Sequence, residues 1–191
     1  IIKIMKSFVL YLLFISYVLS SSASSSSSFV PSPPVWPKEF SCMLFNQIHT
    51  TTPRVALWFY DQGLNSERID YEPTQYRGLE SEYLLYNKNK AYHLHWTNDG
   101  VECRYSTLNH TIFDPDFSNF HYIGKTIIDY FVTYHWQNPQ SQPMEIKDFF
   151  VKLNGEPKYL TFIGHDGKQI NRKFEEFDKG PQDPSIFDIP A

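Results

Sequence analysis

Residues 54–72 read RVALWFYDQGLNSERIDYE, and this stretch decides the fold class. In 54–61, apolar side chains fall at both odd and even positions, so both faces of an extended strand would be apolar. Residues 62–65 have the composition of a turn, and 66–72 return as a strand with Ile69 and Tyr71 on its apolar face. We therefore predict an antiparallel strand pair in which 54–61 is buried on both sides or lines an interior space.

The same pattern of strand, turn and strand continues toward the C-terminus. The turns 98–100 (NDG), 154–155 (NG) and 166–167 (DG) are strong hairpin signals. Residues 107–119 are predicted to be a loop, and helix is expected at most near Phe117 or in 174–177. Sequential hairpins imply an antiparallel sheet. Strands that are apolar on both faces imply that this sheet curves strongly around a core or a ligand cavity. The further predicted strands are 81–86, 91–97, 101–105, 126–136, 145–153, 158–163 and 169–177.

The N-terminal residues have the pattern of a secretory signal. Met5-Lys6 precedes an apolar run, 8–19, that is too short to span a bilayer, and Ser and Ala follow it. We predict a signal peptide over 1–24, with 1–4 read as upstream translation and an uncleaved anchor as the less favoured alternative. A solvated Ser/Pro-rich leader, 25–35, and one domain, 36–191, follow. The expected location is secreted or lysosomal, with no integral membrane segment after cleavage.

The charge balance is mildly acidic. The chain has 17 Lys and Arg against 21 Asp and Glu, and removing Lys3 and Lys6 with the signal leaves 15 against 21, a net charge of −6. Without a basic cluster, this balance argues against nucleic acid or an anionic membrane as the partner. Aromatic residues make up 17% of the chain, which favours β-structure.

Two cysteines and one sequon predict covalent modifications of the chain. In a secreted chain, Cys42 and Cys103 are expected to form one disulfide, with an intermolecular bridge as the open alternative. A thiol nucleophile is much less favoured, because neither cysteine lies in a known nucleophile motif. Asn109-His110-Thr111 is an N-glycosylation sequon in a predicted loop, so Asn109 is expected to be modified.

Several short segments follow one another in a characteristic order. They are 36–40 (WPKEF), 66–71 (SERIDY), Cys103, 114–117 (DPDF), 120–124 (FHYIG), Trp136, 156–159 (EPKY), 162–164 (FIG), Phe177 and 184–190 (PSIFDIP). This series resembles the N-terminal, non-protease domain of secreted papain-family cysteine protease precursors of the counting-factor-associated type. More distantly, it is similar to ependymin-related proteins and to the LolA-like fold.

The resemblance covers nearly all of 36–191 and implies a mainly β fold. That fold is a single curved antiparallel sheet forming an open half-barrel around a hydrophobic cavity, with short helices or loops over the concave face; an α+β arrangement stays open. The family pattern often has a second cysteine just before Trp136, where this chain has Thr133-Tyr134-His135. No papain-type cysteine motif or catalytic His/Asn pair is present in the chain, so it is either a stand-alone relative or the part that precedes a protease domain.

The resemblance and the strands that are apolar on both faces together suggest a non-catalytic domain that binds a hydrophobic small molecule or lipid. No cofactor is expected. A protease domain or another secreted protein is the alternative partner, and any longer precursor could be a cysteine protease. For each aromatic residue taken singly, ordinary core packing is the simpler interpretation. The candidate ligand-binding residues are Trp58, Tyr60, Tyr92, Trp96, Tyr130, Tyr134 and Trp136.

A metal-dependent enzyme is the second alternative. His93 and His95 would point the same way from a strand, and Glu102 on the next strand could be a third zinc ligand. Two histidines without a third at ligand spacing more often belong to a solvated sheet face, so no metal is expected. The carboxylate pairs Asp114/Asp116 and Glu175/Glu176 more often belong to turns or charge runs than to a glycosidase site, and no catalytic residue is assigned.

Overall fold

The computed structural model of the chain describes residues 29–48, 52–74 and 78–190, and nearly all of their regular structure is β. The 3-10 turns η1 (Tyr86–Lys88) and η2 (Pro184–Phe187) are the helical elements of these ranges. None of the described residues forms a helix long and apolar enough to cross a membrane. The strands are β1 (Glu39–Ile48), β2 (Arg54–Asp61), β3 (Ser66–Tyr71), β4 (Glu80–Leu85), β5 (Lys90–Thr97), β6 (Gly100–Thr107), β7 (His121–Ile128), β8 (Phe131–Gln137), β9 (Ile146–Lys152), β10 (Pro157–Ile163) and β11 (Gln169–Lys179).

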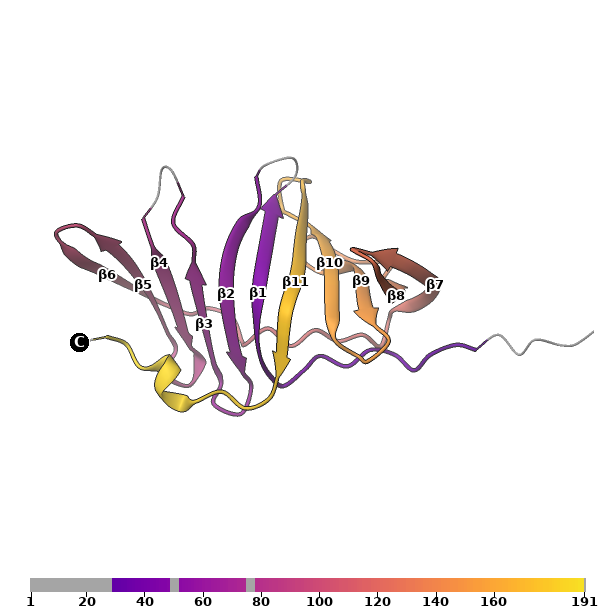
Figure 1. Cartoon of the computed structure of the whole chain (residues 1–191), viewed down its shortest axis with the longest axis horizontal. Helices are drawn as coiled ribbons and strands as arrows, with labels where there is room; N and C mark the ends of the chain where they lie inside the picture. The colour runs from indigo at the N-terminus through magenta and orange to yellow at the C-terminus, as the bar shows by residue number, and fades with distance from the viewer. Residues whose placement is uncertain (1–28, 49–51, 75–77, 191) are drawn as a thin grey trace, which may run out of the picture. The chain divides into compact units, whose positions relative to one another are not determined.

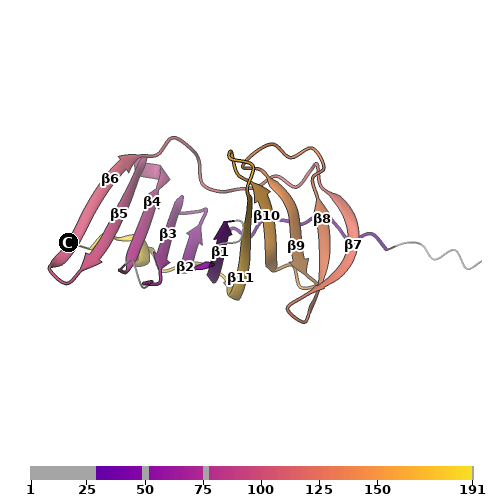
Figure 2. The ribbon, with the colours of Figure 1, turned by 90° about the horizontal axis from the view of Figure 1, so that it is seen from above.

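These strands form one open antiparallel sheet, which confirms the predicted fold class. Their order is β6-β5-β4-β3-β2-β1-β11-β10-β9-β8-β7. β1 to β6 extend the sheet toward one edge, and residues 108–120, which we call the crossover, then carry the chain to the opposite edge (Figures 1 and 2). β7 to β11 return toward the middle, so the last strand pairs with the first. The predicted signal peptide, 1–24, lies outside the described residues.

One face of the sheet, the core face, carries most of the large buried side chains. Phe40 of β1 lies opposite Tyr60 of β2, and Cys42 lies opposite Trp58; all four are buried. Since side chains alternate between faces along a strand, the same alternation brings Phe174 of β11 to this face. β8, β9 and β10 extend the core with Trp136, Ile146, Phe149, Val151, Leu160 and Phe162.

The N-terminal segment and the crossover cover the core face. Phe117 of the crossover stacks on Phe149 with the ring centroids 4.7 Å apart. The Tyr60 hydroxyl donates a hydrogen bond to the Phe113 carbonyl oxygen at 2.9 Å. The protein's own side chains therefore fill much of the concave side on which the resemblance implied a cavity. Trp36 lies among six rings, those of Phe40, Trp58, Tyr60, Phe113, Phe149 and Phe174.

The opposite, outer face is only partly covered. Leu57 of β2 is 45% exposed, so the prediction that 54–61 is buried on both sides is wrong for this face. Near β3, the C-terminal segment packs against the outer face: Arg68 donates to the Ile186 carbonyl oxygen at 2.9 Å, and Phe187 is buried. The doubled apolar pattern of 54–61 therefore reflects one fully buried face and one partly exposed face.

The longest predicted strand, 126–136, is also wrong, because it is a hairpin. β7 ends at Ile128 and β8 begins at Phe131, while Asp129 and Tyr130 between them have φ values of 46° and 69°. Two successive positive φ angles make the tight turn that suits the twist of a hairpin, and glycine or asparagine usually marks it. Here Asp129 and Tyr130 occupy the turn. Because neither is a typical residue for it, the strand pattern of 126–136 shows no interruption.

The structure differs from the predicted secondary structure at three further places. β1 was not predicted, although its apolar residues alternate. The helix suggested near Phe117 is absent from the described crossover, which has no regular structure there. Residues 174–177, the second helical candidate, belong to β11. The predicted loop at 107–119 is confirmed in outline, since β6 ends at residue 107 and β7 begins at residue 121.

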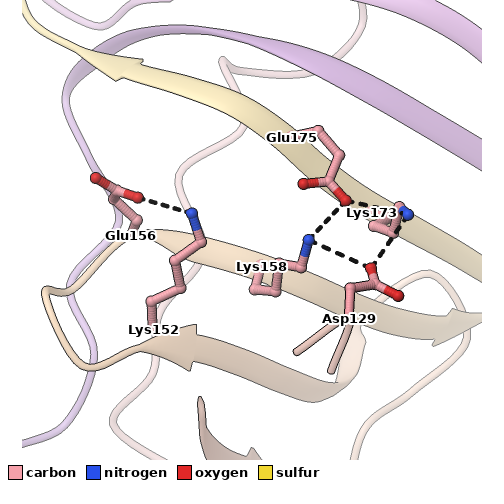
Figure 3. Close-up of polar contacts among 6 residues, drawn as sticks. All are labelled: Asp129, Lys152, Glu156, Lys158, Lys173 and Glu175. Atoms are coloured by element: carbon pink, nitrogen blue, oxygen red, sulfur yellow. Dashed lines mark hydrogen bonds and ion pairs between the residues drawn. The ribbon is translucent and has the colours of Figure 1, made fainter. Parts of the chain in front are cut away.

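An ion-pair cluster on the outer face joins the β7–β8 turn to β10 and β11 (Figure 3). The Nζ atom of the fully buried Lys158 lies 2.6 Å from Glu175 Oε1 and 3.3 Å from Asp129 Oδ2. Lys173 Nζ contacts the same two carboxylates at 3.0 and 3.1 Å. The β9–β10 register shifts between Pro157 and Tyr159, at the position of Lys158. Two cations and two anions therefore balance one another and stabilise the turn.

Acid is expected to destabilise the domain through this cluster. The hydrogen bond from Lys173 lowers the pKa of Asp129; burial would raise the pKa of Glu175, but hydrogen bonds from Lys158 and Lys173 outweigh it and lower that pKa as well. A carboxyl group whose pKa is lower in the folded state contributes stability above its unfolded pKa, about 4, and that stability is lost as the pH falls through the folded value. The free energy of unfolding should therefore decrease from about pH 5 downward.

Urea titrations between about pH 2.5 and 7 would measure this effect. Asp129→Asn should show a shallower acid loss than the wild type, whereas Asp99→Asn, in the exposed β5–β6 turn, should follow the wild-type profile. An acid profile of Asp129→Asn that runs parallel to the wild type would contradict the assignment.

Candidate functional site

A pocket of about 270 Å³ lies between the crossover and the core face, beside β1 to β4 and β11. Its apolar walls are Leu44, Trp58, Ile69, Leu84 and Phe113. Pockets that combine apolar walls with a few convergent polar groups are typical ligand sites, so this pocket is the candidate binding site. Its polar lining consists of Asn46, Glu67, Tyr71, Glu82, Tyr86, His110, Thr111 and Arg172.

Glu67 is the buried acid of the pocket, with 3% of its surface exposed. Its Oε2 atom accepts a hydrogen bond from Trp58 Nε1 at 3.0 Å. Its Oε1 atom accepts from the Tyr86 hydroxyl at 2.9 Å and from the Phe113 backbone N–H at 3.3 Å. Glu67 therefore ties the crossover to β2 and to the turn η1, and both of its oxygens are occupied. Burial raises its pKa, although these three hydrogen bonds oppose the shift.

Arg172 is the cation of the pocket and lies on aromatic rings. Its Cζ atom is 5.2 Å from the ring centroid of Phe162, 5.9 Å from that of Phe113 and 6.0 Å from that of Trp58. Burial lowers the pKa of the guanidinium, while nearby acidic groups, Glu67 among them, act in the opposite direction. Its Nε atom is buried and has no hydrogen-bond partner among the described residues.

Asn46 lies next to Arg172 across the β1–β11 pair, where the two residues are direct register partners. Its Oδ1 atom is also buried without a hydrogen-bond partner in the described part of the chain. A buried donor and a buried acceptor thus lie on neighbouring strands at one wall of the pocket. Since buried polar atoms are nearly always paired, each of them needs an explanation.

The structure places the seven predicted ligand-binding aromatics in four different settings. Trp58 lines the pocket, whereas Tyr60 and Trp136 are buried in the core. Tyr134 is half-buried and packs edge-on against Tyr122. The other three lie away from the core face: Tyr92 and Trp96 belong to the outer-face positions of β5, and Tyr130 is fully exposed in the β7–β8 turn.

The polar residues of the pocket are not among the predicted site residues, although the sequence carries a signal for two of them. Glu67 alternates with Ile69 and Tyr71, so it is the charged member of an otherwise apolar strand face. Arg172 likewise alternates with Ile170 and Phe174. A charge on an apolar face is costly unless it is paired, so such positions mark buried polar sites.

His93 and His95 lie on the β5 positions that share the core-face side with Glu80 and Glu82 of β4. His93 Nδ1 is 3.5 Å from Glu82 Oε1, and His95 Nδ1 is 3.8 Å from Glu80 Oε1. Glu102 is the register partner of His95 and lines a pocket of about 330 Å³ together with both histidines. Nevertheless, no group of three His, Cys, Asp or Glu side chains in the described ranges is arranged to hold a metal ion. The histidines instead pair with glutamates.

The predicted disulfide between Cys42 and Cys103 is not formed in this structure. Both thiols are free; Cys42 is buried in the core and Cys103 is exposed. Cys42 belongs to β1 and Cys103 to β6, which are five strand spacings apart in the sheet, or about 24 Å at about 4.8 Å per spacing. A disulfide needs Cα atoms about 4.4–6.8 Å apart. Burial also raises the pKa of the Cys42 thiol, which makes it unreactive.

The sequon lies just after β6, at the start of the crossover. Asn109 is exposed, while His110 and Thr111 of the same sequon line the pocket. The side chain is therefore accessible to a glycosyl donor, and its modification stays a prediction.

Comparisons with known proteins find similar solved structures but no similar sequence family. No family model matches the sequence, and no curated protein sequence matches it. The structure is similar to that of an uncharacterized conserved protein from Thermus thermophilus, with a TM-score of 0.55, 8% identity, and coverage of 81% of this chain and 86% of that one.

Two further solved structures are similar. One is MucB in complex with MucA, with a TM-score of 0.49, 10% identity, and coverage of 80% of this chain and 54% of that one. The other is a LolA superfamily protein from Nitrosomonas europaea, with a TM-score of 0.35, 9% identity, and coverage of 81% and 92%. At 8% identity, the likeness to the Thermus thermophilus protein establishes a shared fold and nothing about function.

Proposed function

We propose that this chain is a non-catalytic binding domain of the secretory pathway, and that its pocket holds the apolar part of a small, lipid-like ligand. The observation that carries the proposal is the pocket itself. Leu44, Ile69 and Leu84 provide apolar walls, and buried polar groups converge on one side. Each methylene of a ligand buried against such walls would contribute about 0.8 kcal/mol.

The filled core face limits the size of the ligand. Trp36 and Phe117 occupy the concave side beyond the pocket. A volume of about 270 Å³ lies just below the range of about 300–1,000 Å³ that is usual for drug-sized ligands. The pocket therefore suits a short chain, or one end of a longer one, rather than an entire long acyl chain.

The hydrogen bonds of Glu67 give its carboxyl group a structural role. Its Oε1 atom accepts from Tyr86 and the Phe113 N–H, and its Oε2 atom accepts from Trp58. The carboxyl group thus anchors the crossover.

Filling the pocket is expected to weaken the binding of a neutral apolar dye such as Nile red. Leu84→Trp would place an indole in the pocket that Leu84 lines, whereas Leu57→Trp puts the same group on the outer face of β2. Fluorescence titration should show binding to the wild type and to Leu57→Trp, with an affinity loss of about tenfold or more in Leu84→Trp. Equal dye binding by the two variants, or no binding by the wild type, would count against the pocket.

A second candidate function is protein contact, as an accessory or pro-domain of a papain-family protease precursor. The observation that favours it is the β7–β8 hairpin, where Ile127 is 70% exposed and Tyr130 is fully exposed. β7 is the last strand at its edge, and an apolar edge strand is a surface to which another chain can pair. Co-elution of a papain-family protease domain with the wild type, but not with Ile127→Lys, would support this candidate. Absence of co-elution would oppose it.

A further inference from the structure

We infer that the polar end of the ligand is a carboxyl group, held by Arg172 and Asn46. This inference rests on the proposed binding function, because it names the chemistry that the same pocket recognises. The Nε atom of Arg172, in the pocket wall, is buried without a hydrogen-bond partner among the described residues. A guanidinium has five N–H donors and no acceptor, so any ligand group that pairs with it must be an acceptor.

The rings beneath Arg172 fix the position of the guanidinium. Phe162, Phe113 and Trp58 all lie within about 6 Å of its Cζ atom, in the range of cation–π attraction. A cation held in this way is presented to the pocket without the entropy loss of ordering a free side chain. Charge-assisted hydrogen bonds from such a donor are about twice as strong as neutral ones.

Asn46 narrows the choice of ligand group. Its unpaired Oδ1 requires a donor, and it lies on the strand position that faces Arg172. A protonated carboxyl group can accept from Arg172 through its carbonyl oxygen and donate to Asn46 through its O–H, whereas a carboxylate has no donor for Asn46 and instead forms a charge-assisted pair with Arg172. An alcohol can also donate to Asn46 and accept from Arg172, but it carries no charge to pair with the guanidinium, and an ester has no donor.

The other charges in the pocket argue against a phosphate. Glu67 and Glu82 line the same space, and the charge of a dianion would be repelled by them more strongly than that of a group with at most one negative charge. The pocket therefore favours a short-chain carboxylic acid over a phosphate ester with the same chain.

Isothermal titration of the whole domain with octanoate, octanol and methyl octanoate, at pH 7, tests the inference. We expect the wild type to bind octanoate about tenfold or more tightly than the other two, since one charge-assisted contact corresponds to about that factor. Arg172→Met should bind all three ligands alike. Arg104→Met is the matched control, because Arg104 is exposed on β6 and outside this pocket, and it should keep the wild-type preference.

The outcomes separate the inference from the proposed function. Equal affinity of the wild type for octanoate and octanol would overturn the carboxyl inference and leave the pocket as an apolar site. Binding of none of the three ligands would overturn both. If Arg172→Met does not fold, Arg172→Lys, which keeps the charge but lacks Nε, should lose part of the octanoate preference; an unchanged preference would oppose the role of the guanidinium.

Discussion

Replacing Glu67 by alanine is expected to lower the free energy of unfolding by about 3–5 kcal/mol, because it leaves three buried or half-buried donors without an acceptor at about 1–3 kcal/mol each. The donors belong to Trp58, Tyr86 and the Phe113 backbone, which lie on β2, on η1 and in the crossover. For a domain of this size, that loss corresponds to a decrease in Tm of roughly 8–15 °C. Thermal and urea unfolding would measure it.

Two controls make the Glu67 prediction specific. Glu72→Ala removes an exposed carboxylate just after the same strand and should change stability by no more than about 0.5 kcal/mol. Glu67→Gln keeps the shape but turns one acceptor into a donor, so its cost should be intermediate. A Glu67→Ala protein as stable as Glu72→Ala would show that the crossover does not depend on this anchor.

The pH dependence of Glu67 has the opposite sign to that of the ion-pair cluster. Burial raises its pKa above the ordinary 4.5, so the folded state binds a proton more readily than the unfolded state. Its contribution to stability is therefore fully present below about pH 4.5 and decreases as the pH rises through the folded pKa. Glu67→Gln cannot titrate, so its free energy of unfolding should not show this decrease as the pH rises above 4.5.

Replacing Trp36 by alanine is expected to cost about 3–5 kcal/mol, the usual range for deleting a buried aromatic side chain. Trp36 is 4% exposed, and six rings surround it. Two of these rings, those of Trp58 and Phe113, also line the pocket. The cavity left by the indole should therefore open toward the pocket, and the variant should bind more Nile red than the wild type does.

Trp36→Phe and Val35→Ala are the matched variants for this experiment. Phenylalanine refills part of the space and should recover part of the stability, while Val35 is 79% exposed and its truncation should have little effect. Urea unfolding of these samples would measure the loss of stability, and dye titration of the same samples would measure the increase in Nile red binding. If Trp36→Ala unfolds like the wild type, the indole is not a structural part of the core.

Much of the strand pattern was predictable because it is local. Alternation and turn composition placed 54–61 at the bounds of β2, and they placed 66–72 within one residue of β3. The Asn-Asp-Gly, Asn-Gly and Asp-Gly turns each lie where two strands of the sheet are joined. Each of these features depends on neighbouring residues alone, through side-chain alternation and turn preferences.

The errors have equally definite causes. The turn at Asp129 and Tyr130 has two positive φ angles but contains none of the residues that usually mark them. The number of cysteines suggests that Cys42 and Cys103 pair, although four strands lie between β1 and β6. A single charge in a strand, such as Glu67 or Arg172, is most often solvent-exposed, so the local pattern does not mark these two residues as buried.

The amino-acid sequence by itself determined that this chain forms antiparallel hairpins with one apolar face, because both properties repeat every two residues along each strand. Only the tertiary structure decided that β1 pairs with β11, that Trp36 and the crossover fill the concave side, and that Asn46 and Arg172 become neighbours. The contacts between β1 and β11 join residues more than a hundred positions apart. They form because the crossover carries the chain to the opposite edge of the sheet, and no local pattern encodes which distant strand will be adjacent.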